Sequence, residues 1–80
     1  MERFFFDSEV DAELVVDEAG REFSSVEAVR QFALEALGDV AKDAIRQGAT
    51  LIAIAVKNEA GDLVFCARAS ITMQSLSDLA

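Results

Sequence analysis

The sequence predicts an α+β domain of order β-β-α-β-β, in which a four-stranded, mostly antiparallel sheet carries one long helix on one face. Residues 24–48 have the apolar period of an amphipathic helix and contain no proline. The apolar segments on both sides of it are shorter, β-branched or aromatic, and separated by glycine-containing turns. The 80 residues suffice for one small domain, which we expect to span residues 1–73 before a C-terminal tail, residues 74–80.

The first hairpin is predicted from three consecutive phenylalanines in residues 3–7, which alternate in direction and need cover on both sides of a strand. Residues 8–13 are acidic and are expected to form a loop. Residues 14–16 then form a second strand that pairs with the first. Residues 17–20 have the composition of a tight turn with glycine in the left-handed position, and residues 21–23 lead into the helix.

The ends of the helix carry capping signals. Ser24 and Glu27 have the spacing of a capping box, Arg46 suits the negative end of the helix dipole, and Gly48 is the expected left-handed terminator. Burial of the apolar face should hold the helix, because it outweighs exposed ion pairs. This face consists of Val26, Val29, Ala33, Ala36, Leu37, Val40 and Ala44, with Phe32 on its flank.

The second hairpin consists of a strand at residues 50–57, a turn at residues 58–61 and a strand at residues 63–73. The preferred register concentrates bulk on the helix side. It pairs Val56 with Leu63, Ile54 with Phe65, and Ile52 with Ala67. A three-residue loop with a bulge at Gly61 is the alternative and shifts this pairing by one residue. Beyond it, Leu76 and Leu79 suit either a short helical turn or a loose tail.

The opposite side of this hairpin is small, smooth and apolar, whereas a solvated sheet face alternates to polar residues. In a short chain that is 52% apolar, such a surface indicates association. We therefore expect an interface there, most simply with a second copy of the chain, so that the protein is a homodimer. The interface residues are Leu51, Ala53, Ala55, Val64 and Cys66.

The net charge of −8 disfavours contact with nucleic acid and with anionic membranes. No apolar run reaches the ~18 residues that span a bilayer. The first apolar run is three residues long, too short for a signal peptide. These features lead us to expect a cytoplasmic protein without a membrane or nucleic-acid partner.

The residue types disfavour an enzyme. The chain has no histidine or tyrosine, no phosphate-binding glycine loop and no fixed pair of carboxylates, so we expect no catalytic residues and no cofactor. The one cysteine, Cys66, excludes an internal disulfide and a cysteine metal cage, and is expected to be a buried, inert thiol.

Four acidic residues match part of a calcium-loop template. They occupy positions 1, 3, 5 and 12, but Ala12 stands where the template needs glycine, and too few residues precede it for the first helix. An acidic hairpin loop is therefore favoured over a metal site. The four residues are Asp7, Glu9, Asp11 and Glu18.

Several motifs together carry a family resemblance. They are the run Arg-Phe-Phe-Phe-Asp at residues 3–7, Asp17-x-x-Gly20-x-Glu22, the alanine-rich helix, and Val56-Lys57-Asn58-Glu59-x-Gly61. The chain resembles, over residues 3 to about 72, a family of short bacterial proteins catalogued as a domain of unknown function. Phe4 stands where many members carry tyrosine, and residues 8–13 are acidic where glycine is frequent. The family supplies no catalytic residues to carry over.

A weaker similarity is to HicB-like antitoxins, through Gly20-x-x-x-Ser24-x-x-Glu27-Ala28 and a hairpin before the helix. That resemblance implies an acidic protein that neutralises a small basic toxin. The chain lacks the proline-containing stretch typical of that family and an added DNA-binding segment. Two functions follow from the sequence: a non-enzymatic, homodimeric interaction or structural module, or an acidic, antitoxin-like inhibitor or regulator of a basic protein partner.

Overall fold

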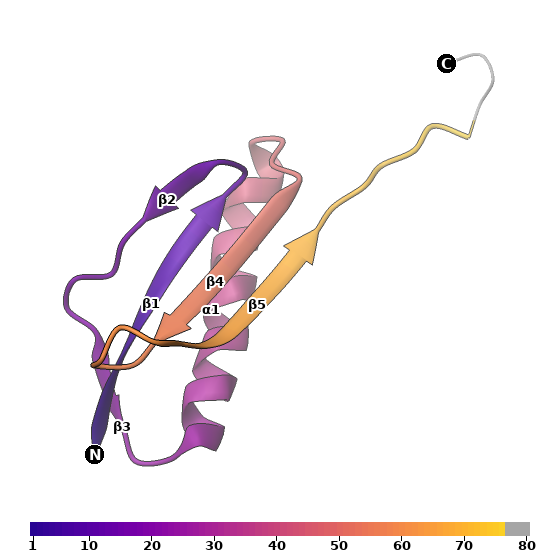
Figure 1. Ribbon diagram of the computed structural model, residues 1–80. Coiled ribbons are helices and arrows are strands. Elements are labelled where there is room, and N and C mark those ends of the chain that lie inside the picture. The colour runs from indigo at the N-terminus through magenta and orange to yellow at the C-terminus, as the bar shows by residue number, and fades with distance from the viewer. Residues whose placement is uncertain (77–80) are drawn as a thin grey trace.

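A computed structural model describes residues 1–76 as one helix lying behind an antiparallel sheet (Figure 1). The order is β-β-β-α-β-β, so the predicted α+β class is confirmed with one more strand than expected. Residues 21–23, expected only to lead into the helix, pair with the start of the first strand. The elements are Glu2–Val10 (β1), Glu13–Val15 (β2), Arg21–Phe23 (β3), Val26–Arg46 (α1), Leu51–Lys57 (β4) and Leu63–Ser70 (β5).

Strand β1 organises the sheet, whose order is β2-β1-β4-β5. Its first residues pair with β3, and its last residues pair with β2 on one side and β4 on the other. The prediction of a loop over residues 8–13 is therefore wrong for residues 8–10, which continue β1. The turn is limited to Asp11 and Ala12, with Asp11 in the left-handed region at φ 55°.

The helix begins one residue later than the capping box predicted. The N-cap is Ser25, whose Oγ accepts a hydrogen bond from the N–H of Ala28 at 3.2 Å. Ser24 is not the cap, because Phe23 is still paired in β3 and Ser24 serves as the connection. At the other end Gly48 adopts φ +87°, which confirms the predicted left-handed terminator.

The core lies between α1 and the helix-facing side of β4. Val29 and Ala33 are buried with Ile54 and Val56, and the predicted helix face is right along most of its length. Ala44 is buried with Ile52 in a second cluster nearer the helix C-terminus. The rings of Phe6 and Phe32 extend this core, with T-shaped packing at a centroid distance of 4.8 Å. Val26 is the exception, 62% exposed beside a surface hollow at the start of the helix.

At the turn between β4 and β5 the alternative register holds: Lys57 pairs with Leu63, the N–H of Asn58 donates to the carbonyl of Asp62 at 3.0 Å, and Gly61 has φ +88°. Residues 59–61 form the loop, and Oδ1 of Asn58 accepts hydrogen bonds from the N–H groups of Ala60 and Asp62. A further bulge beyond Lys57 then displaces the rest of β5 by two residues from the preferred register. A shift of two residues keeps each side chain on its side of the sheet. Only Leu63 changes: it lies opposite Lys57, and it is exposed instead of facing the helix. The observed pairs are Val56 with Phe65, Ile54 with Ala67, and Ile52 with Ala69.

Strand β5 ends at Ser70, before the predicted end at residue 73. The N–H of Ile71 still donates to the carbonyl of Thr50 at 2.8 Å, and residues 72–76 then lead away from the domain (Figure 1). Because backbone groups alternate in direction along a strand, Cys66, Arg68 and Ser70 direct theirs away from β4. Within residues 1–76, β5 pairs with β4 alone. The suggested helical turn lies partly outside the described residues, since it includes Leu79.

Candidate functional site

The side of the sheet that α1 leaves uncovered contains most of the predicted interface. We call it the outer face; it lies opposite the helix in Figure 1. Leu51, Ala53, Ala55 and Cys66 line one hollow of about 260 Å³ there. The fifth residue, Val64, lies apart from the hollow at the β5 bulge and is exposed. The outer-face hollow is lined by Asp7, Glu9, Leu14, Leu51, Ala53, Ala55, Cys66 and Arg68.

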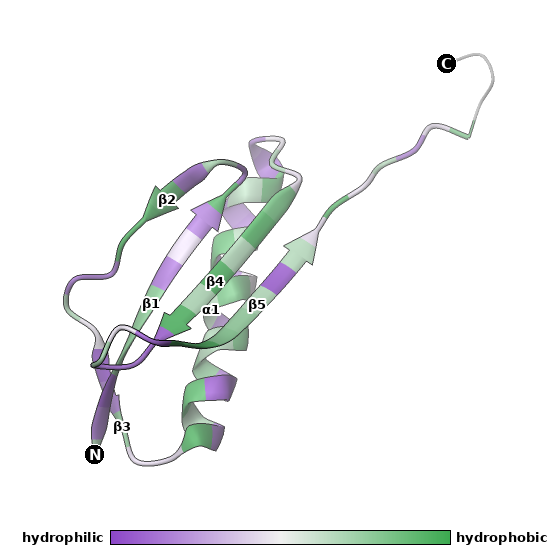
Figure 2. Cartoon of the chain, viewed as in Figure 1, coloured by the Kyte–Doolittle hydropathy of each residue, from purple (hydrophilic) through white to green (hydrophobic). Residues whose placement is uncertain are grey.

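The pairing of β1, β4 and β5 places Glu9 and Arg68 on opposite sides of the apolar centre of this hollow. Glu9 on β1 pairs with Ala53 on β4, and Ala53 pairs with Arg68 on β5. Two strand spacings, about 9–10 Å, therefore separate the backbones of Glu9 and Arg68. Figure 2 shows the same division by hydropathy: β4 is hydrophobic over most of its length and the later part of β1 is hydrophilic.

The expectation that Cys66 is buried is wrong for the single chain. Cys66 pairs with Ala55 on the outer face, away from the helix, and its side chain is exposed. The shorter side chains of its neighbours on β4 give it no cover.

Asp7 is the one buried charged residue among those described. It contacts the loop that begins at Asp17, between β2 and β3. Its Oδ2 is 2.6 Å from Nζ of Lys57, and its Oδ1 accepts a hydrogen bond from the N–H of Asp17 at 2.9 Å. Asp17 in turn accepts hydrogen bonds from the N–H groups of Phe6, Ala19 and Gly20. These bonds fix residues 17–20 against β1.

The pKa of Asp17 reflects two opposing causes. Partial burial raises it, but the hydrogen bonds from Phe6, Gly20 and Ala19 and the charge of Arg3 together hold it below the ordinary value of 3.8. The carboxylate is therefore ionised at neutral pH and serves as a fixed acceptor for this segment.

Asp11 holds the β1–β2 turn to the start of β4. Its Oδ1 accepts hydrogen bonds from the N–H groups of Thr50 and Leu51, both at 3.1 Å, and from Oγ1 of Thr50 at 3.3 Å. The two backbone bonds hold the pKa of Asp11 below its ordinary value. Its charge is therefore present at neutral pH beside the turn.

The four residues of the calcium-loop template do not converge. Asp7 is paired with Lys57, and Asp11 is bonded to the start of β4. Glu9 lies between them on the outer face, and Glu18 is exposed in the next loop. Within residues 1–76, no group of three or more His, Cys, Asp or Glu side chains is arranged to hold a metal ion.

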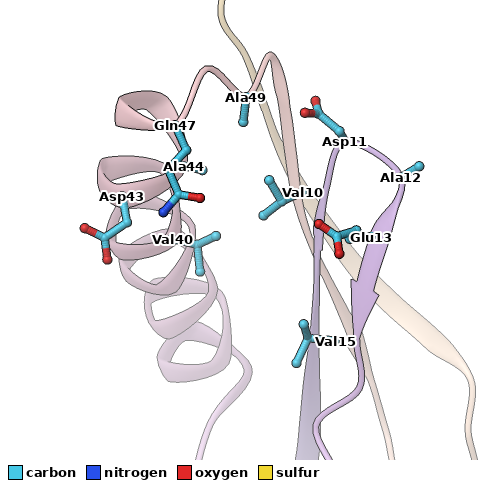
Figure 3. A pocket seen from close by; sticks show the side chains of 10 residues that line it. All are labelled: Val10, Asp11, Ala12, Glu13, Val15, Val40, Asp43, Ala44, Gln47 and Ala49. Atoms are coloured by element: carbon cyan, nitrogen blue, oxygen red, sulfur yellow. The ribbon is translucent and has the colours of Figure 1, made fainter.

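A second surface, which the sequence did not indicate, is a groove between α1 and the β1–β2 hairpin (Figure 3). Its volume is about 740 Å³. The groove follows from the position of β2, which α1 does not contact. The sequence gives no position for β2 relative to the helix; its only signal is the apolar Val15 in a very short strand. We call it the helix–hairpin groove. It is lined by Val10, Asp11, Ala12, Glu13, Val15, Val40, Asp43, Ala44, Gln47 and Ala49.

The two surfaces provide apolar contact area and fixed charge. Within the described part of the chain, every buried polar side-chain atom has a hydrogen-bond partner, so none is left aimed at a ligand. In that same part, no helix is both long and apolar enough to cross a bilayer.

Comparison with known proteins gives one family. Residues 3–70 match the family model described as Domain of unknown function (DUF6894). No curated protein and no solved structure matches the chain. The match covers every strand and the helix, apart from the first residue of β1.

Proposed function

We propose, for a chain that belongs to the family Domain of unknown function (DUF6894), the role of a non-enzymatic interaction module that forms a homodimer through the outer-face hollow. The family description states no activity, so the proposal rests on the surface of the molecule. The observation that carries it is the row Glu9, Ala53, Arg68 across the sheet. This row is apolar at its centre and oppositely charged at its ends.

A second copy suits this row because the row is complementary to itself under one two-fold rotation. An axis parallel to the strands and above β4 places β1 of one copy over β5 of the other. Each Glu9 then faces the partner's Arg68, and the small side chains of Ala53 and Ala55 allow the two sheets to approach. An axis across the strands would place acidic β1 on acidic β1, which electrostatic repulsion disfavours.

The dimer also accounts for exposed apolar side chains on this face. Leu14 and Leu51 flank the hollow, and both are exposed in the single chain. Burial of such side chains contributes about 25 cal/mol for each Å² removed from water. Cys66 would be covered in the same contact.

The test is the oligomeric state of charge-exchange variants, measured by sedimentation from about 1 µM to about 1 mM protein. Glu9→Arg and Arg68→Glu each place like charges opposite one another, so each should weaken the dimer. The double variant exchanges the two charges and should restore it. Glu35→Arg, on the exposed side of the helix, is the matched control and should leave the dimer intact. A wild-type chain that stays monomeric, or a double variant without recovery, would contradict this interface.

The second candidate function is an acidic inhibitor or regulator that binds a basic protein. It is supported by the concentration of charge near the N-terminus, where the first 25 residues contain eight acidic and two basic residues. Electrostatic attraction of this kind weakens when salt screens it. Co-purification should return a small basic protein that is released at roughly 0.5 M salt. A partner without net positive charge, retained at that salt, would exclude this function.

A further inference from the structure

We infer that the helix–hairpin groove binds a segment of a basic partner protein in which apolar side chains alternate with lysine or arginine. This inference rests on the second proposed function, binding of a basic protein, and is independent of the homodimer. It names the surface and the chemistry of the segment that would occupy it.

The groove exists because the helix does not reach β2. Helix α1 contacts β1, β3, β4 and β5, but it makes no contact with β2. Val15 lies on the helix-facing side of β2, since it pairs with Ser8 and Ser8 pairs with the core residue Ile54. The described part of the chain, residues 1–76, leaves Val15 65% exposed.

The floor of the groove is apolar. Val10, Val15 and Val40 point into the space between the hairpin and the helix (Figure 3). Ala44 and Ala49 are buried and also line the groove. Apolar side chains of a partner segment would therefore leave water on binding here, which is the largest favourable contribution that such a surface offers.

The rim of the groove is acidic. Asp11 and Glu13 stand on the hairpin side, and Asp43 lines the helix side with its carboxylate directed away from the hairpin in Figure 3. Among residues 1–76, no lysine or arginine lines the groove. The hydrogen bonds from Thr50 and Leu51 keep Asp11 ionised at neutral pH. Carboxylates on both sides of an apolar floor favour an occupant with positive charges beside its apolar side chains.

The chain itself does not supply such an occupant. A second copy carries a net charge of −8, and residues 71–80 contain Asp78 and no lysine or arginine. Both would bring negative charge to an acidic rim, which costs free energy. Nucleic acid is disfavoured for the same reason. The charge of the groove therefore selects another protein, and a basic one.

The test uses the full chain labelled with nitrogen-15 and a synthetic peptide of roughly 12 residues that alternates leucine and lysine. Saturable shifts are expected at the amides of Val10, Ala12, Val15, Val40 and Ala44. Oligolysine of the same length and spermidine carry charge without apolar side chains, and should bind at least about 10-fold more weakly. Equal binding of either compound at the groove would overturn the inference.

Matched variants separate the groove from general attraction. The double variant Glu13→Lys with Asp43→Lys reverses the charge at these two positions of the rim. It should weaken binding of the leucine–lysine peptide by about 10-fold or more. The double variant Glu35→Lys with Asp39→Lys makes the same change in net charge on the exposed helix surface. It should weaken binding of the peptide much less. Equal loss in the two double variants would overturn the groove as the site.

The location of binding distinguishes the groove hypothesis from the broader hypothesis that the chain binds a basic partner. Saturable shifts confined to other surfaces, such as residues 17–22, would overturn the groove and leave the binding of a basic partner standing. Absence of saturable binding by any cationic probe at about 1 mM would overturn both.

Discussion

Nζ of Lys57 lies 2.6 Å from Oδ2 of Asp7, and the two side chains differ sharply in burial: that of Asp7 is 6% exposed and that of Lys57 is 37% exposed. The pair joins β1 to β4 diagonally, because Asp7 pairs with Ala55 and Lys57 with Phe5. The carboxylate depends on its partner more than the ammonium does, since the ammonium remains in contact with water.

Removal of the lysine should therefore cost more than removal of the acid. We expect Lys57→Met to lower the free energy of unfolding by about 2–3 kcal/mol, because it leaves a buried carboxylate with only the N–H of Asp17. Asp7→Asn should cost about 1–2 kcal/mol, because Lys57 can rehydrate. Urea unfolding measures both, with Lys42→Met on the exposed helix surface as the control. The reverse order would show that Asp7 is better solvated than its burial indicates.

Acid should destabilise the fold through Asp17. Its pKa lies below 3.8 in the folded chain, so the stability that its ionised form provides is present above pH 3.8 and is lost as pH falls through the lowered value. The free energy of unfolding of the wild type should accordingly fall more steeply below about pH 4 than that of Asp17→Asn. Chemical unfolding at a series of pH values gives the two slopes, and parallel slopes would contradict the prediction.

Two glycines should respond oppositely to alanine. Gly20 has φ +70°, and a Cβ there would lie 2.7 Å from Cε2 of Phe5, so Gly20→Ala should lower the free energy of unfolding by about 1–3 kcal/mol. Gly38 lies within α1, where a Cβ meets no atom within 4 Å. Gly38→Ala should therefore raise stability by about 0.5–1 kcal/mol. Thermal unfolding of both variants tests this, and a loss in Gly38→Ala would indicate a contact at that surface.

The helix phase can be tested by one pair of substitutions. Val29 is completely buried, so Val29→Asp places a charge in the core without a partner and should prevent folding. Glu35 is exposed on the same helix, and Glu35→Lys should change the free energy of unfolding by no more than about 0.5 kcal/mol. Circular dichroism of the two purified variants measures the outcome. Similar helix content in both would mean that Val29 is not in the core.

Periodicity made the architecture predictable from sequence. The helix phase placed Val29, Ala33 and Ala44 in the core, and the two-residue period of β4 separated Ile54 from Ala55 correctly. These patterns depend on neighbouring residues along the chain. They remain valid even when the partner strand is displaced by two residues.

Some of the errors concern choices that local sequence leaves nearly equal in free energy. Ser24 and Ser25 are both good N-caps, and the pairing of Phe23 with Glu2 decides between them. The turn follows the alternative with its bulge at Gly61, but a further bulge between Val56 and Lys57 sets the register of the rest of the hairpin. The helix–hairpin groove could not be predicted at all, because it depends on where the helix crosses the sheet.

The edge of β5 that faces away from β4 gives the negative net charge of this molecule a further role. The strand carries a single charge, Arg68, and no proline. Within residues 1–76 the backbone groups on its outer edge pair with no other strand, so they can accept a strand from a neighbouring chain. A dimer formed by two sheet faces is closed and stops at two copies. Addition of strands at a sheet edge can continue from one copy to the next. Mutual repulsion between strongly negative molecules opposes such growth, and it vanishes near the isoelectric point of about 4.2. Mild acidification is thus expected to turn a dispersed solution into ribbons or precipitate before the domain itself unfolds.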